Sequence, residues 1–282
     1  MNALEIRGLT KRRGDFALQG LDLTLPAGCI MGLIGENGAG KSTTIRLILN
    51  ALSRDGGTVA VYGKDNRALT PLEREDIGAV LDEVGLPEYL TAAQTGRMMA
   101  GIFARWQPEV YRDYLRRLAL PEDKPFRDFS RGMKMKLGLA AALSHQPRLL
   151  LLDEATSGLD PVVRDEILTI FADFTRDEEH AVLISSHIVS DLEKICDSIA
   201  FVHKGRLLFC EEKDRLMEEY ALLKLSRADF EAMPPEAVVS VRENPYGVEA
   251  LVRRELVNEA LTPERATLEE IILFFVKGAD AR

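Results

Sequence analysis

The alternation of apolar and polar positions divides the chain into regions with different periods. Residues 3–9 and 16–25 alternate with a period of two, which predicts two strands of a half-exposed antiparallel sheet. Residues 29–34, 148–153 and 181–186 are instead nearly continuous apolar runs. Such runs are typical of strands that are buried on both faces of a parallel sheet.

Residues 88–146 hold no strand-like run and show helical periodicity instead. We expect helices at 95–106, 108–120 and 130–144, the last rich in Ala, Leu and Lys. These helices predict a helical subdomain at about 88–146, inserted between two core strands. The other expected core elements are helices at 44–49, 161–176 and 189–196 and strands at 58–62, 77–81, 199–203 and 206–210. This alternation of buried strands and helices predicts an α/β fold with a parallel sheet.

A new pattern of short alternating segments begins after about residue 220. The expected elements are strands at 221–225, 238–242 and 247–252 and a helix at 267–276. The last two strands can pair across residues 244–246, and Thr267 with Glu270 can cap the closing helix. We therefore predict two domains, a large one at 1–220 and a small α+β accessory domain at 221–282.

Composition excludes some classes of protein. The chain of 282 residues has 45 acidic and 36 basic residues and a formal net charge of -9, which argues against a general nucleic-acid binder. We expect no signal peptide at the N-terminus and no membrane span, because no apolar run approaches the ~20 residues that a span needs. If the protein works at a membrane, another chain must then span the bilayer. The cysteines, Cys29, Cys196 and Cys210, are expected to be free thiols in a reducing compartment.

The stretch Gly35–Thr43 matches G-x-x-x-x-G-K-[ST], the phosphate-binding P-loop. An expected buried strand precedes it and an expected helix follows, which is the context that the motif requires. Glycines let backbone N–H groups converge on phosphate oxygens, and the helix N-terminus adds its positive dipole end. An ordinary glycine-rich turn is the alternative, which the complete match disfavours. The residues expected to bind the nucleotide here are Gly35, Glu36, Asn37, Gly38, Ala39, Gly40, Lys41, Ser42 and Thr43.

Two carboxylates and a histidine lie at the ends of two expected strands that are consecutive in the sequence. Asp153 and Glu154 end one buried run, and His187 follows the next. Ligands of open α/β sheets bind at this carboxyl edge. We expect Lys41 at the β- and γ-phosphates, Ser42 and Asp153 on Mg²⁺, Glu154 activating water, and His187 donating to a γ-phosphate. An acidic turn and a solvated loop histidine are the alternatives, and His187 alone would favour the second.

Five motifs occur together in the order and spacing of ABC-type ATPases, over residues 3 to about 220. They are Gly35–Thr43, Phe129–Met133, Leu152–Glu154, Ser157–Asp160 and Ser186–His187. The chain resembles the ATP-binding subunit of a bacterial ABC transporter, most closely those that work with ABC-2-type export permeases. This likeness implies a P-loop NTPase core of the ABC type with an antiparallel N-terminal subdomain.

The resemblance also implies the reaction, the cofactors and the partners. ATP and Mg²⁺ would bind, and water would attack the γ-phosphorus with Lys41, Glu154 and His187 as the catalytic set. Ser130 and Gly132, in the signature motif, and Asp160 would contact nucleotide across a head-to-tail dimer, expected to be a homodimer. The chain would work in the cytoplasm, peripheral on the inner face of the cell membrane, where it would power an integral membrane permease.

Three residues depart from the family pattern. Met133 stands where the signature usually has glutamine. Arg13 stands where an aromatic side chain usually stacks on adenine; a guanidinium can also stack, or Phe16 takes this role, unless Phe16 is core. Asp82 replaces a glutamine at the end of the strand before the helical insertion. We expect Asp82 to be a metal-side ligand, with a turn cap as the alternative, and Glu83 takes the role if the alignment is one residue early.

Two other classes of function are compatible with a P-loop. One is a soluble ABC-type ATPase that acts on ribosomes, DNA or another non-membrane complex, and the other is a nucleotide-binding regulator with negligible turnover. Members that act on ribosomes usually carry two such cassettes in one chain, whereas this chain has one. Members that repair DNA interrupt the core with long coiled coils, which this sequence lacks. Both observations disfavour the first class. The carboxylate of Glu154 disfavours the second.

Overall fold

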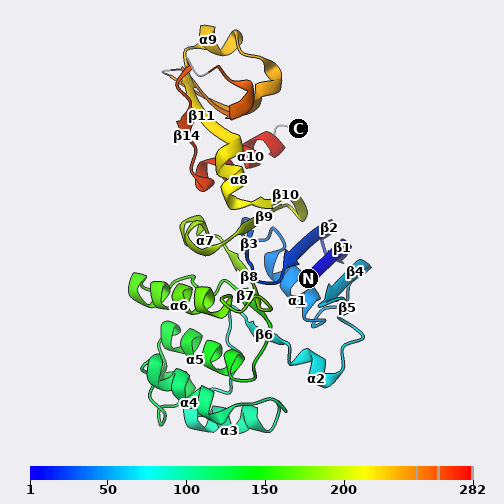
Figure 1. Ribbon diagram of the computed structural model, residues 1–282, viewed down its shortest axis with the longest axis vertical. Helices are drawn as coiled ribbons and strands as arrows, with labels where there is room; N and C mark the ends of the chain where they lie inside the picture. The colour runs from blue at the N-terminus through cyan, green and yellow to red at the C-terminus, as the bar shows by residue number, and fades with distance from the viewer. Residues whose placement is uncertain (246, 259–260, 281–282) are drawn as a thin grey trace.

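The computed structural model describes residues 1–245, 247–258 and 261–280. Its central sheet consists of β3 Ile30–Ile34, β6 Ile77–Val80, β7 Leu149–Asp153, β8 Ala181–Ser186, β9 Ser198–His203 and β10 Arg206–Glu212. The strands lie in the order β10-β9-β3-β8-β7-β6 (Figure 1), all parallel except β10. Every residue of β3, β7 and β8 is buried. The predicted α/β core is therefore confirmed.

Side chains that alternate along the central strands enter two different cores. Met31 and Leu33 of β3 pack in one core with α1 Lys41–Ile48 and with the N-terminal sheet. Ile30 and Ile34 of the same strand pack in the other core, which includes residues of α6 Pro161–Phe174 and α7 Val189–Ile195. This alternation follows from the two-residue period of a strand. α1 begins three residues earlier than its predicted start at 44, so Lys41 is its first residue.

The N-terminal sheet is antiparallel, as predicted. Its strands are β1 Asn2–Arg13, β2 Phe16–Pro26, β4 Gly56–Val61 and β5 Lys64–Asp65. They lie in the order β2-β1-β4-β5. Leu21, Leu23 and Leu25 of β2 are buried and alternate with exposed residues. One face therefore covers the core and the other meets solvent. The short helix α2 Pro71–Arg74 follows this sheet.

The helical region lies between β6 and β7. It contains α3 Ala92–Ala100, α4 Pro108–Arg117, a 3₁₀ turn at Phe126–Asp128 and α5 Arg131–Leu143. The expected helix at 95–106 is wrong at both ends. A capping box of Thr91 and Gln94 starts α3 earlier, and the helix ends at Ala100. The backbone N–H groups of Ala104 and Arg105 instead donate to the buried carboxylate of Glu75, at 2.7 and 2.8 Å.

The C-terminal segment, residues 220–280, lies at one end of the molecule (Figure 1). Its elements are β11 Tyr220–Leu225, α9 Arg227–Glu231, a 3₁₀ turn at Pro235–Ala237, β12 Val238–Asn244, β13 Gly247–Arg253, a 3₁₀ turn at Arg254–Leu256, β14 Glu264–Arg265 and α10 Leu268–Asp280. The sheet order is β12-β13-β11-β14. The predicted strands and closing helix are confirmed, and the predicted turn at 244–246 includes Tyr246, which lies outside the described residues.

Helix α8 Lys213–Glu219, which the sequence did not predict, leads into this segment. The segment is not separate from the core: Phe275 of α10 packs on Phe209 of β10, with ring centroids 5.0 Å apart. Ile271 and Phe274 belong to the same apolar cluster as the core strands. The opposite face of the small sheet contributes to a separate apolar cluster, which includes Leu223 and Val252. The domain boundary at residue 220 stays a prediction.

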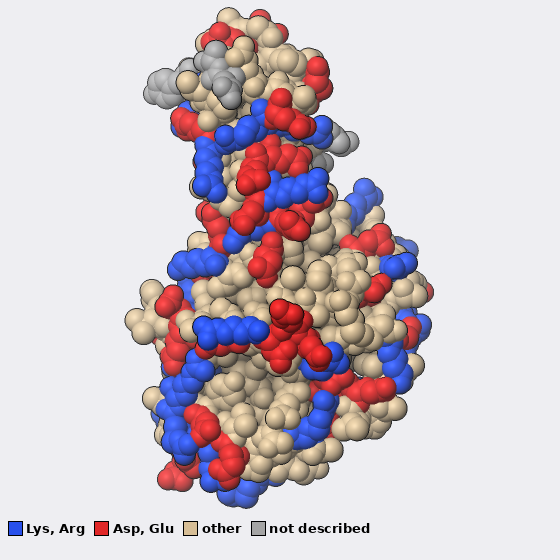
Figure 2. All heavy atoms as spheres, in the orientation of Figure 1, with Lys and Arg blue, Asp and Glu red and all other residues tan. Residues whose placement is uncertain are grey.

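Charged side chains of both signs are interspersed on the face in Figure 2, most densely where the C-terminal segment meets the core. The cysteines are free, and burial raises the pKa of the Cys196 thiol. In the part of the chain that the structure describes, no helix has the length and apolar character of a membrane span.

Candidate nucleotide site

Residues 35–40 connect β3 to α1 as a tight turn that only glycine permits at two points. A Cβ on Gly35 would lie 2.3 Å from the carbonyl oxygen of Val202. Gly40 has φ +116°, and a Cβ there would lie 2.9 Å from Cζ of Phe16. The backbone of this turn can therefore approach a phosphate closely, and the N-terminus of α1 follows directly.

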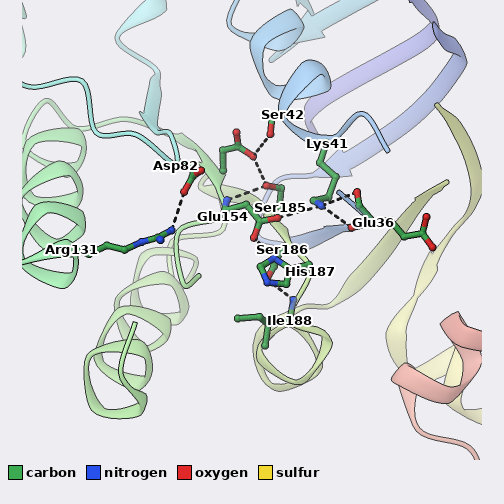
Figure 3. Close-up of polar contacts among 12 residues, drawn as sticks. Glu36, Lys41, Ser42, Asp82, Arg131, Glu154, Ser185, Ser186, His187 and Ile188 are labelled. Atoms are coloured by element: carbon green, nitrogen blue, oxygen red, sulfur yellow. Dashed lines mark hydrogen bonds and ion pairs between the residues drawn. The ribbon is translucent and has the colours of Figure 1, made fainter. Parts of the chain in front are cut away.

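The side chain of Lys41 folds back across this turn (Figure 3). Its Nζ donates to the carbonyl oxygens of Gly35 at 2.6 Å and of Glu36 at 3.3 Å. The same Nζ lies 3.3 Å from Oε1 of Glu154, and the lysine side chain is only 5% exposed. A buried ammonium group needs such partners. Phosphate oxygens would offer Lys41 stronger ones.

Ser42, Asp153 and Ser185 form a hydrogen-bonded group in which Asp153 and Ser185 are buried. The Ser42 hydroxyl donates to Oδ1 of Asp153 at 3.0 Å, and the Ser185 hydroxyl donates to the same oxygen at 2.6 Å. Sheet register explains the second contact, because Asp153 and Ser185 are partners on β7 and β8. Our sequence-based site did not include Ser185. The only signal was its place at the end of a strand whose neighbour could not be deduced from the sequence.

These oxygens suit Mg²⁺. The ion prefers hard oxygen ligands and takes one or two from protein alongside phosphate and water. A hydroxyl and a carboxylate 3.0 Å apart at the carboxyl edge of the sheet meet that requirement. Within the described ranges no group of three or more His, Cys, Asp or Glu side chains could hold a metal alone. Phosphate and water oxygens would complete the shell of a metal here.

Glu154 lies at the centre of the polar contacts. Its backbone is left-handed, with φ +52°, and its N–H donates to the hydroxyl of Ser185 at 3.1 Å. Oε2 lies 2.7 Å from Nδ1 of His187, and Oε1 faces Lys41. Non-glycine residues in this conformation are uncommon and cluster at functional sites. The carboxylate is thereby held between a lysine and a histidine at the mouth of the turn.

A cleft of about 500 Å³ joins these groups, which is within the range of small-molecule sites. Its described lining residues are Arg13, Phe16, Glu36, Asn37, Gly38, Gly40, Lys41, Ser42, Thr43, Asp82, Arg131, Glu154, Ser157 and His187. Arg13 and Phe16 face each other across the β1–β2 turn, so both candidate base contacts lie on one cleft. Ser157 and Arg131 are lining residues that our sequence-based site did not include.

Six predicted residues do not line this cleft. Gly35, Ala39 and Asp153 are absent from its lining. Ser130 and Asp160 are N-caps: Ser130 accepts from Met133 N–H at 3.3 Å, and Asp160 accepts from Val163 N–H at 3.0 Å. Gly132 lies in the first turn of α5, beside Ser130. Met133, which stands where the signature usually has glutamine, packs against the core.

Comparison with known proteins gives one family. The sequence profile described as ABC transporter matches residues 18–157. The lantibiotic transport ATP-binding protein SrtF of Streptococcus pyogenes is 31% identical, over 75% of this chain and 91% of SrtF. The bacitracin transport ATP-binding protein BcrA of Enterococcus faecalis is 32% identical, over 73% of this chain and 68% of BcrA. A solved ATP-binding subunit of an ABC transporter matches with a TM-score of 0.67 and 27% identity, covering 76% of this chain and 91% of that one.

The chain therefore belongs to the ABC transporter family, as an ATP-binding subunit. Members of this family hydrolyse ATP to power transport. The predicted family, the fold class and the ATPase activity are confirmed. The roles of individual residues stay predictions.

Proposed function

We propose that this chain binds Mg-ATP in the 500 Å³ cleft and that its hydrolysis drives an export permease. The observation that carries the proposal is the position of Glu154, 2.7 Å from His187 and 3.3 Å from Lys41, beside the oxygen pair of Ser42 and Asp153. Export is supported by the similar proteins, which are named for bacitracin and lantibiotic transport.

The contacts indicate what each side chain does when nucleotide arrives. Lys41 leaves Glu154 for the β- and γ-phosphates, because phosphate oxygens carry more charge than a carboxylate. Glu154 is then free to accept a proton from water, while the contact with His187 keeps the Glu154 carboxylate in its orientation. Ser42 and Asp153 would hold Mg²⁺, with Asp82 on the metal side. The ion supplies charge neutralisation at the phosphates.

A second copy would complete the site. Ser130, Gly132 and Asp160 lie outside their own cleft, at the N-termini of α5 and α6. Backbone N–H groups at a helix N-terminus favour an anion, and a head-to-tail homodimer would present those of α5 to the γ-phosphate of its partner. Two-fold symmetry makes the two resulting sites equivalent.

The permease partner would hold the chain on the cytoplasmic face of the cell membrane. We expect low ATPase activity from the isolated chain and a rise when the permease is present. The helical region lies between β6 and β7; Asp82 comes two residues after β6, and Asp153 is the last residue of β7. A movement of the permease can therefore reach the phosphate site through it. We do not include nucleic acid among the partners, because the net charge is -9.

Phosphate release tests this proposal. It would be measured for the isolated chain, for the chain with permease in lipid vesicles, and for Glu154→Gln in both conditions. We expect stimulation by the permease and none in the variant. Full activity of the chain alone, indifferent to any membrane fraction, would support a soluble ATPase acting on a non-membrane complex. Release that survives Glu154→Gln would contradict the site itself.

A further inference from the structure

Asp82 and Arg131 form an ion pair on the wall of the nucleotide cleft (Figure 3). Nη2 of Arg131 donates to Oδ1 of Asp82 at 3.1 Å, across 49 residues of sequence. Asp82 follows β6, and Arg131 is the first residue of α5. Each side chain is 55% exposed, and both line the cleft with Lys41. The pair therefore joins the helical region to the wall of the phosphate site.

The position of Arg131 in helix α5 does not favour a positively charged side chain. The N-terminus of a helix carries a positive partial charge, so a cation in the first turn is unfavourable. No acidic residue lies in the first turn of α5 to offset it. The guanidinium is instead held from outside the helix: it bonds Asp82, and a Cβ on Gly158 would lie 3.1 Å from its Nη1. The Arg131 side chain is thus bonded by Asp82 and lies close to Gly158.

The charged side chains that line the cleft are balanced in number, and this pair contributes one of each sign. Among the described residues, Arg13, Lys41 and Arg131 are the lining cations, and Glu36, Asp82 and Glu154 are the lining carboxylates. Lys41 faces Glu154, and Arg131 faces Asp82. Mg-ATP carries a net negative charge. Without Arg131, the carboxylate of Asp82 would oppose the incoming phosphates.

We propose that Arg131 is a positioning residue that neutralises and orients Asp82, so that the two act as one unit in Mg-ATP binding. The inference rests on the proposed function of the cleft and extends it to a residue of the signature segment. Because Arg131 acts through Asp82, the loss of Arg131 must be compensated by removing the charge of Asp82. A direct contact of Arg131 with phosphate, or a purely structural role, would not show this rescue.

The test is a double-mutant cycle on the full chain. Dissociation constants for Mg-ATP would be measured by calorimetric titration at saturating Mg²⁺ for the wild type, Asp82→Asn, Arg131→Gln and the double variant. We expect Arg131→Gln to weaken binding about fivefold when Asp82 is present, and by less than about twofold when Asp82 has already been replaced by Asn. The fivefold loss should shrink at high salt, since the pair is exposed.

Arg117→Gln is the matched control. Arg117 also forms an exposed ion pair, with Asp173 at 3.0 Å, but it does not line the cleft. The affinity of the Arg117→Gln variant for Mg-ATP should therefore equal that of the wild type. Thermal unfolding of all variants identifies any that misfold. The proposal would be overturned if Arg131→Gln weakened binding as much in the Asp82→Asn background as in the wild type, so that the two single losses simply add. If the wild type itself bound no Mg-ATP, the proposed function would be wrong instead.

Discussion

The nucleotide cleft and the C-terminal segment both lie against the central sheet, but different kinds of contact hold their residues in place. At the cleft, polar side chains at the ends of β7 and β8 bond one another: Ser185 joins Asp153 and the backbone of Glu154. At the other end, α10 is attached by apolar packing, as in the rings of Phe209 and Phe275. Hydrogen bonds fix direction, whereas apolar burial supplies undirected free energy.

This difference indicates a division of labour. Substitutions in the cleft should change turnover while leaving the free energy of unfolding nearly unchanged. Substitutions under α10 should do the reverse. The predictions below test that division, beginning with the largest expected effect.

The largest effect is expected for Glu154→Gln. The amide keeps the shape of the side chain and its contacts with Lys41 and His187, but it cannot accept a proton from water. Hydrolysis should fall by a factor of about 10² or more, while ATP still binds. Phosphate release and nucleotide titration measure the two quantities.

The same variant should accumulate as an ATP-bound dimer. Removing one carboxylate lowers its repulsion with the phosphates that face it across the closed interface. Light scattering with and without Mg-ATP would show the change in mass. A variant that binds ATP and remains monomeric would contradict the head-to-tail dimer.

The second prediction concerns the attachment of the C-terminal segment. Phe275→Ala removes a ring that lies 5.0 Å from Phe209 and 5.5 Å from Tyr220. Phe275 is partly buried, so the free energy of unfolding should fall by about 2 kcal/mol, below the loss at a fully buried site. Urea unfolding followed by circular dichroism measures it, and kcat of the isolated chain should not change.

Leu273→Ala is the control for this substitution. Leu273 lies on the same helix but is 44% exposed, so its truncation should have little effect on stability. If Phe275→Ala lowered kcat without lowering stability, the C-terminal segment would act on the cleft, and the division of labour would fail.

The two regions also differ in how much the sequence could predict. Around the cleft, the period of the strands and the spelling of the P-loop fixed the elements and most lining residues. Contacts between distant segments were not predictable, because a pattern shows which face is buried but not against what. Ser185 and Arg131 were therefore missed, although Ser185 lies in the predicted strand at 181–186 and Arg131 lies in the motif Phe129–Met133.

At the C-terminal end the strands were predicted but their attachment was not. Helix α8 has seven residues, too few to show a period among so many charges. The apolar face of residues 267–276 predicted a helix, yet its burial against β10 and α7 required the fold. Local patterns also misplaced the end of α3, where Glu75 holds residues 104 and 105 out of the helix.

The smallest expected effect concerns Asp82, which lies at the edge of the cleft. Its Oδ1 faces Arg131, and its second oxygen is free to meet Mg²⁺ directly or through water. A carboxylate oxygen is a preferred ligand of Mg²⁺, but this side chain is 55% exposed and therefore well screened. Asp82→Ala should raise the Mg²⁺ concentration for half-maximal hydrolysis by only about threefold.

Binding of metal-free ATP by Asp82→Ala should stay similar or tighten slightly, because one negative charge has left the phosphate site. Asp82→Gln should restore much of the usual behaviour of the family, in which this position is usually glutamine. Glu83→Ala is the neighbouring control: Glu83 lines other clefts but not the nucleotide cleft, so its Mg²⁺ titration should match the wild type. A shift in Glu83→Ala instead would mean that the strand end was aligned one residue early. If the titration of Asp82→Ala overlays the wild type, Asp82 is not a metal ligand, and its role is the pair with Arg131 alone.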